Sequence, residues 1–126
     1  YNENSRVQRS LGAAPDRLRV IPNGIDPSRF TALPCRRDPR RPLVALLGRV
    51  VPIKDVITFI RAAAIVHARL PEARFVVLGP TDEDPAYVEE CARTIAALRL
   101  DGVVELVGRV RIDDWLPRID LLVLTS

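Results

Sequence analysis

Cysteine, histidine and long apolar runs are scarce in this sequence, and each scarcity excludes a class of protein. The 126 residues include two cysteines, Cys35 and Cys91, and one histidine, His67. Two cysteines are too few for a disulfide framework and have no neighbours at metal-ligand spacing, so we expect no metal site and a cytoplasmic location. A lone histidine leaves no credible Ser-His-Asp arrangement. No apolar run approaches about eighteen residues and no signal-peptide pattern opens the chain, so we expect neither a membrane span nor export.

Excess charge is also small. Lys and Arg number 19 and Asp and Glu 16, which gives a formal net charge of +3. This balance is compatible with a phosphate-bearing ligand, but no basic tract with interleaved aromatic residues points to a nucleic acid partner. The one basic run lies in a proline-rich stretch, residues 31–42, and is interrupted by Asp38. We interpret this stretch as an exposed connector.

The apolar pattern alternates between strand and helix periods. Short apolar runs predict four strands, at residues 43–48 (LVALLG), 74–79 (RFVVLG), 103–108 (VVELVG) and 119–125 (IDLLVLT). Between them, helical spacing predicts a helix over 55–70, a second that begins after Asp84-Pro85, and a short helix or turn over 113–118. Strands that alternate with helices indicate an α/β fold, a Rossmann-like parallel sheet with flanking helices.

Apolar stripes on the two longer helices predict which side chains face the sheet. On the first helix the expected buried residues are Val56, Phe59, Ile60, Ala63, Val66 and Leu70. On the second they are Val88, Cys91, Ile95 and Leu98.

The first part of the chain differs in character. Residues 2–12 are polar and compatible with a helix, 18–22 (LRVIP) read as a short strand, and Asn23-Gly24 is a turn signal. We expect residues 1–17 to be a terminal helix and linker from a preceding domain. Residues 18–126 are then expected to form a partial domain, truncated at its C-terminus, because the chain ends on a strand that the pattern predicts to be buried.

The segment that carries candidate chemistry follows the first strand and reads GRVVPIKD. It places Arg49 and Lys54 five residues apart, at the carboxyl end of a strand and before a helix N-terminus whose first N–H groups have no internal partner. Arg and Lys both suit phosphate oxygens, and ligands of open α/β sheets bind beyond the carboxyl ends of the strands. The pair suits a diphosphate, although two surface charges at a strand end are the plain alternative.

Glycines close the first three strands, at Gly48, Gly79 and Gly108. Glycine at this edge lets backbone or ligand approach closely, but each could also be an ordinary turn residue. The usual phosphate motifs are missing, since neither a G-x-G-x-x-G fingerprint nor a Walker loop occurs.

The remaining polar and aromatic residues have structural interpretations. Asp82, Glu83 and Asp84 are expected to be a helix N-cap with first-turn acids, although paired carboxylates can also perform acid/base chemistry. His67 is expected far from the crevice, and Trp115 is expected to pack a short helix onto the sheet.

Several segments together resemble the C-terminal domain of group 1 (family 4) retaining glycosyltransferases, which have GT-B architecture. IPNGID followed by Phe30 resembles the segment that opens that domain, and LLGRVVPIKDVITFIRAA resembles its GR-x4-K segment. The segments from FVVLGPTDEDP to LVGRV resemble its second and third strand units, and DLLVLTS the strand before its Glu-x7-Glu motif. Within the family, these segments most resemble those of cytosolic transferases of bacterial exopolysaccharide synthesis.

The resemblance implies roles for matching positions. Arg49 and Lys54 match the family's pair on the donor diphosphate, Gly48 matches the Gly that lets the loop approach, and the backbone at Gly108, Arg109 and Val110 matches the segment that touches the nucleobase. It implies no metal or other cofactor, because the cations stabilise the leaving group. It implies that residues 18–126 are a partial nucleotide-sugar-binding domain. It implies a nucleotide-sugar donor, with UDP favoured, a saccharide acceptor, and a membrane-bound polysaccharide synthase complex as a partner. The Glu-x7-Glu motif is expected beyond Ser126, so we expect this segment alone to be inactive.

Two other functions remain open at this stage. One is a different GT-B enzyme, such as a sugar-nucleotide epimerase or a phosphorylase. The other is a non-catalytic module that keeps the nucleotide site for assembly or regulation. Residues beyond Ser126 would separate these alternatives from a transferase.

Overall fold

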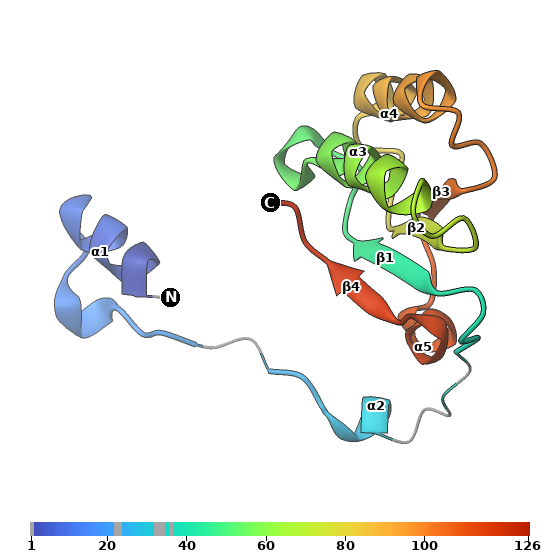
Figure 1. The fold of residues 1–126 in the computed structure, drawn as a ribbon. Helices are drawn as coiled ribbons and strands as arrows, with labels where there is room; N and C mark the ends of the chain where they lie inside the picture. Colours follow the sequence, from blue (N-terminus) through green and yellow to red (C-terminus); the bar gives the residue numbers. More distant parts are fainter. Residues whose placement is uncertain (1, 22–23, 32–34, 36) are drawn as a thin grey trace. The chain divides into compact units, whose positions relative to one another are not determined.

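A computed structural model describes residues 2–21, 24–31, 35 and 37–126. The chain forms two compact units, Tyr1–Ala32 and Leu33–Ser126 (Figure 1). Each unit is described separately below.

The first unit contains two short helices, α1 (Asn2–Ser10) and α2 (Ser28–Thr31), with a 3₁₀ turn at Pro15–Arg17. The helix expected in residues 2–12 is therefore confirmed. The strand expected at 18–22 is wrong for residues 18–21, which pair with no neighbouring strand, and Val20 and Ile21 are 49% and 80% exposed. A strand requires hydrogen bonds from a neighbour, which apolar character alone does not supply. Pro22 and Asn23 of the expected strand and turn lie outside the described residues.

The second unit is built on a parallel sheet of four strands, β1 (Leu43–Leu47), β2 (Arg74–Leu78), β3 (Val104–Gly108) and β4 (Leu121–Val123). Their order across the sheet is β3-β2-β1-β4, so β1 and β2 are the interior strands (Figure 1). The expected α/β class and parallel sheet are confirmed. The last strand is shorter than the expected 119–125, and its residues at 121 and 122 are largely exposed.

A one-residue irregularity interrupts the pairing of β2 with β3. Val77 pairs with Leu106, but Leu78 pairs with Gly108, so Val107 is an extra residue in β3. Such bulges are common at sheet rims near functional sites. The irregularity immediately precedes the loop that contains Arg109.

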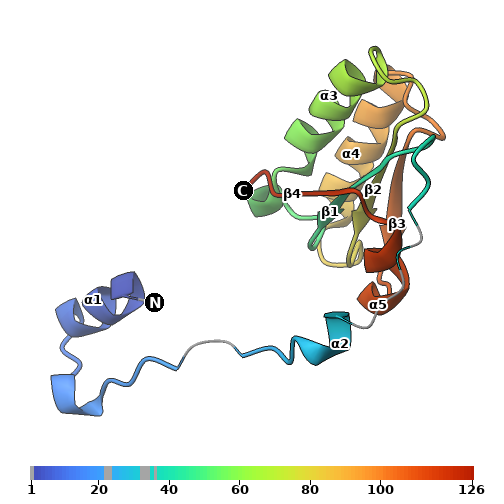
Figure 2. The same cartoon turned by 60° about the horizontal axis from the view of Figure 1, so that its bottom comes forward.

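Helices cover the two faces of the sheet. On one face, α3 (Val56–His67) and α4 (Pro85–Ala97) pack against inward side chains such as Leu46 and Val77, while α5 (Ile112–Trp115) packs on the opposite face with Ala45 and Val76 (Figure 2). Successive side chains of a strand thus pack against helices on opposite faces of the sheet, as the two-residue period of a strand requires. Trp115 packs against the second cluster, which confirms its expected structural role.

The helical stripes agree with expectation near the helix starts and fail near their ends. Val56, Phe59, Ile60, Ala63, Cys91 and Ile95 are buried. Val66 and Leu70 are 38% and 56% exposed, and Leu98 is 40% exposed. The reason is that Val66 lies in the last turn of α3, while Leu70 and Leu98 lie beyond the last helical residues and leave the stripe. Tyr87, which the stripe omitted, is buried in the first turn of α4.

Two isoleucines of α3 provide a matched test of this packing. Ile60 is fully buried and Ile65 is 64% exposed. We expect Ile60→Ala to lower the free energy of unfolding by about 2–5 kcal/mol, because it removes buried methyl groups and leaves a cavity. Ile65→Ala should change it by less than about 0.5 kcal/mol. Urea unfolding followed by circular dichroism measures both, and equal losses would contradict the assigned buried face of α3.

Candidate functional site

The carboxyl ends of three strands meet at one edge of the sheet. Gly48 N donates to the Leu78 carbonyl at 3.0 Å, and Gly79 N donates to the Gly108 carbonyl at 2.9 Å. The three strand-closing glycines therefore lie side by side, as the sequence predicts. This edge is where open α/β sheets bind ligands.

Gly79 is required by a close contact between two loops. A Cβ atom at this position would lie 2.1 Å from the Gly48 carbonyl oxygen and 3.3 Å from the Arg49 backbone nitrogen. Any larger residue would push the loop after β2 away from the loop after β1. Gly108 differs, because its φ of +86° favours glycine while a Cβ there would meet nothing within 4 Å.

The loop that carries Arg49 and Lys54 is held by its own residues. Val50 is completely buried and its N–H donates to the Pro80 carbonyl at 2.9 Å, which fixes the loop to the core. A 3₁₀ turn at Pro52–Lys54 then leads to Asp55, whose φ is +46°. Aspartate tolerates this left-handed conformation and its carboxylate accepts from Thr58 N at 3.3 Å, so one residue both turns the chain and caps α3.

Lys54 lies over the end of β1. Its side-chain carbons come within 3.5–3.7 Å of the Cβ position of Gly48, which is ordinary van der Waals contact. Its carbonyl accepts from Thr125 Oγ1 at 2.8 Å, which joins the loop to the segment after β4. Within the part of the chain that the structure describes, the Lys54 ammonium has no ion pair.

Arg49 is engaged by a carboxylate. Its Nη1 lies 2.7 Å from Oε2 of Glu83, and the two side chains are 54% and 40% exposed. Arg109 forms a similar but longer pair, with Nη2 at 3.7 Å from Oδ1 of Asp82. The loop between β2 and α4 thus reaches arginines on both neighbouring loops.

This pairing corrects the interpretation of the three acids. Asp84 is the N-cap of α4 as expected, since its carboxylate accepts from Tyr87 N at 3.0 Å. Asp82 and Glu83 precede the helix instead of occupying its first turn, and they bind the arginines. The sequence contained a signal for this pairing, because the two acids follow an interior strand whose neighbours lead into loops that contain arginines. The rules for helix starts do not use that signal.

The start of α3 offers fewer free donors than the sequence suggests. Thr58 N is bonded by Asp55, and Ile57 N donates to the Tyr87 hydroxyl at 3.4 Å. The helix start is therefore largely satisfied by the protein itself, so an anion at this edge would depend mainly on the side-chain cations.

Burial shifts two pKa values on α4. Desolvation raises the pKa of Tyr87, with smaller opposing effects from the backbone N–H groups of Ile57 and Val56. Desolvation also raises the pKa of Cys91 to about 11, so its thiol stays neutral near pH 7. Both groups act as packing residues, which confirms the expected core position of Cys91.

The other residues singled out in the sequence lie around and beyond this edge. Val110 is half-buried against the second cluster and lies with Arg109 in the loop that follows Gly108, the last residue of β3. His67 is the last residue of α3, at the helix end opposite to the site. Among the described residues, no group of three His, Cys, Asp or Glu side chains is placed to hold a metal ion.

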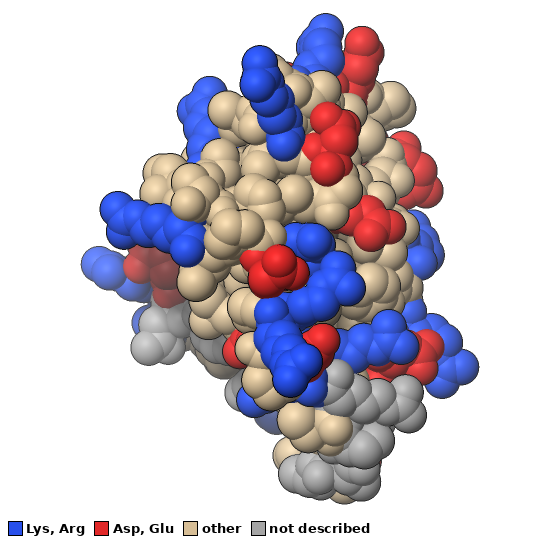
Figure 3. Space-filling model, turned by 45° about the vertical axis from the view of Figure 1, so that its right-hand side comes forward, with Lys and Arg blue, Asp and Glu red and all other residues tan. Residues whose placement is uncertain are grey.

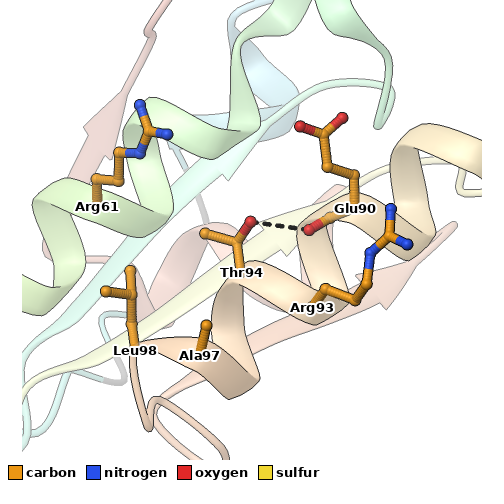
Figure 4. Close-up of a pocket in the computed structure, with 6 residues that line it drawn as sticks. All are labelled: Arg61, Glu90, Arg93, Thr94, Ala97 and Leu98. Carbon is orange, nitrogen blue, oxygen red and sulfur yellow. Dashed lines mark hydrogen bonds between the residues drawn. The ribbon is translucent and has the colours of Figure 1, made fainter.

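Two further surface features lie outside this edge. A groove of about 380 Å³ lies between α3 and α4, lined by Arg61, Glu90, Arg93, Thr94, Ala97 and Leu98 (Figure 4). On the side of the molecule shown in Figure 3, basic and acidic side chains are interspersed.

Of the helices in the described ranges, none is long and apolar enough to cross a membrane.

The chain is similar in sequence to curated D-inositol 3-phosphate glycosyltransferases. It is 30% identical over 98% of its length to D-inositol 3-phosphate glycosyltransferase 2 of Catenulispora acidiphila, and covers 33% of that protein. It is 34% identical over 86% of its length to D-inositol 3-phosphate glycosyltransferase of Rhodococcus jostii, and covers 25% of it. The chain thus spans a third or less of the length of these relatives.

The fold also has a solved counterpart. Anabaena HepE, crystallised in complex with UDP and glucose, matches 99% of this chain with a TM-score of 0.75 at 20% identity, over 36% of its own length. Residues 41–126 match the family model described as glycosyl transferases group 1. With this match over more than half of its length, the chain belongs to the group 1 glycosyl transferases.

Proposed function

We propose that this chain is the donor-binding part of a retaining glycosyltransferase that uses a nucleotide-diphospho-sugar. The observation that carries the proposal is the position of Lys54 and Arg49 beside Gly48, at the carboxyl end of an interior strand. Family membership supports it, and so does the likeness of fold to a protein solved with UDP and glucose. UDP is the nucleotide that we propose.

Each site residue has a proposed task. The Arg49 guanidinium presents a planar fork of donors to phosphate oxygens, and the Lys54 ammonium adds a compact charge. Gly48 lets the backbone approach the diphosphate. The backbone of Gly108, Arg109 and Val110 contacts the nucleobase, on the neighbouring side of the same edge.

The two cations stabilise the departing diphosphate. When the bond to the anomeric carbon breaks, negative charge grows on the leaving phosphate oxygen, and donors aimed there lower the barrier. Each charge-assisted hydrogen bond contributes about 1.5–3 kcal/mol, so two contribute roughly 3–6 kcal/mol, or about 10²–10⁴ in rate. The contribution of Arg49 should lie near the lower end of the range for one hydrogen bond, because its side chain is half-exposed and already paired with Glu83.

The wider setting belongs to the same proposal. The acceptor is a saccharide, and the narrower likeness is to the cytosolic transferase of Pel exopolysaccharide synthesis, with a membrane-bound polysaccharide synthase complex as partner. Catalytic residues for the sugar are expected in the Glu-x7-Glu motif, C-terminal to Ser126. The proposed location is cytoplasmic.

Removal of either cation tests the mechanism. In the full-length protein, Arg49→Ala and Lys54→Ala should each lower kcat by more than about tenfold, because each removes a charge-assisted bond to the leaving group. Arg93→Ala is the matched control, since Arg93 is also exposed and ion-paired, but lies within α4 and away from the loops that carry Arg49 and Lys54. Initial rates with UDP-sugars measure the effect, and circular dichroism verifies the fold. Normal turnover in either variant would remove that residue from the mechanism.

Nucleotide preference is a separate test. Calorimetric titration of the full-length protein with UDP, GDP and ADP should show the tightest binding for UDP. Uridine should bind more weakly than UDP, because it lacks the diphosphate that the cations contact. Equal affinity for uridine and UDP would contradict a diphosphate site at Arg49 and Lys54.

A further inference from the structure

We propose that Glu83, assisted by Asp82, occupies the donor's phosphate site when no donor is bound, and that the diphosphate must displace it from Arg49. This inference rests on the proposed function of the same edge. It assigns the loop between β2 and α4 a part in donor binding, as an internal competitor for the phosphates.

The first support is the placement of the loop. It follows β2, which lies between β1 and β3 in the sheet, so it stands between the loops that carry Arg49 and Arg109. It pairs with both, through Glu83 at 2.7 Å and Asp82 at 3.7 Å. The contact at Gly79 keeps this loop against the loop of Arg49.

The second support is the chemistry of the contact. A carboxylate and a phosphate use the same guanidinium N–H donors, so Glu83 and the donor compete for Nη1 of Arg49. A diphosphate bound to Arg49 would also lie close to the Glu83 carboxylate that it had displaced. Removing the negative charge of Glu83 therefore favours donor binding in two ways. It frees Arg49, and it removes the repulsion between Glu83 and the diphosphate.

The third support is the contrast with Lys54. Among the residues that the structure describes, the Lys54 ammonium has no ion pair, while Arg49 is occupied. Lys54 is thus ready to meet the donor first, and Arg49 joins after exchange of its partner. Because the Arg49–Glu83 pair is half-exposed, its competition should amount to about two- to fivefold in affinity.

An opposite role for Glu83 makes a different prediction. If Glu83 held Arg49 in the orientation that binds phosphate, loss of its charge would weaken donor binding. If the pair served only to join two loops, its loss would lower thermal stability and leave UDP affinity unchanged. The sign of the change in affinity separates the three roles.

The test compares variants of the full-length protein by calorimetry with UDP and with uridine. Glu83→Gln preserves the shape of the side chain and should bind UDP about two- to fivefold more tightly than the wild type. Its affinity for uridine should not change, because uridine has no phosphate to compete. Asp82→Asn should act in the same direction but less, since its pair is longer and more exposed.

Glu89→Gln is the matched control. Glu89 is on α4 and pairs with Arg93 at 3.7 Å, so this change removes a similar charge away from the edge and should leave both affinities unchanged. Weaker or unchanged UDP binding in Glu83→Gln, with uridine affinity retained, would overturn the inference alone. Failure of the wild type to bind UDP would overturn the proposed function, and the inference with it.

Discussion

The approach of two loops at Gly79 determines how the candidate site is built. The backbone of Gly48 lies where a Cβ atom of residue 79 would stand, so the loops after β1 and β2 are in direct contact. This contact brings Glu83 to Arg49, although the two residues are 34 positions apart in the chain. Buried Val50 and its hydrogen bond to Pro80 reinforce the same junction.

The site depends on side chains more than on helix ends. Asp55 and Tyr87 already bind the first donors of α3, and Asp84 caps α4. Backbone groups are thereby used to fix the loops, so the diphosphate site proposed at this edge would rely on the side chains of Arg49 and Lys54. The affinity of such a site for an anion depends on neighbouring carboxylates, because a carboxylate can bind the same side-chain donors as the anion.

The fold follows closely from the sequence, since each interior strand is a largely apolar run and each of the first two crossovers contains a helix with an apolar stripe. The ends of the first three strands agree with this pattern to within one residue, and so do the Asp84 cap and the positions of His67 and Trp115. The stripe failed at Val66, Leu70 and Leu98 because helix length, which tertiary packing decides, limits how far a stripe continues. The roles of Asp82 and Glu83 were also missed, because local periodicity contains no information on partners from other loops. The tasks assigned to Gly48, Arg49, Lys54, Gly108, Arg109 and Val110 stay predictions.

The extra residue in β3 has a consequence for how this chain can vary in length. The bulge absorbs Val107, so Gly108 lies opposite Leu78 and the residues after it keep their register with β2. Loss of that one residue would remove the bulge and its local bend, but would leave Gly108 opposite Leu78 at the start of the loop that contains Arg109. A single deletion at Val107 therefore preserves the pairing of β3 with β2 and alters the local twist at the rim of the sheet.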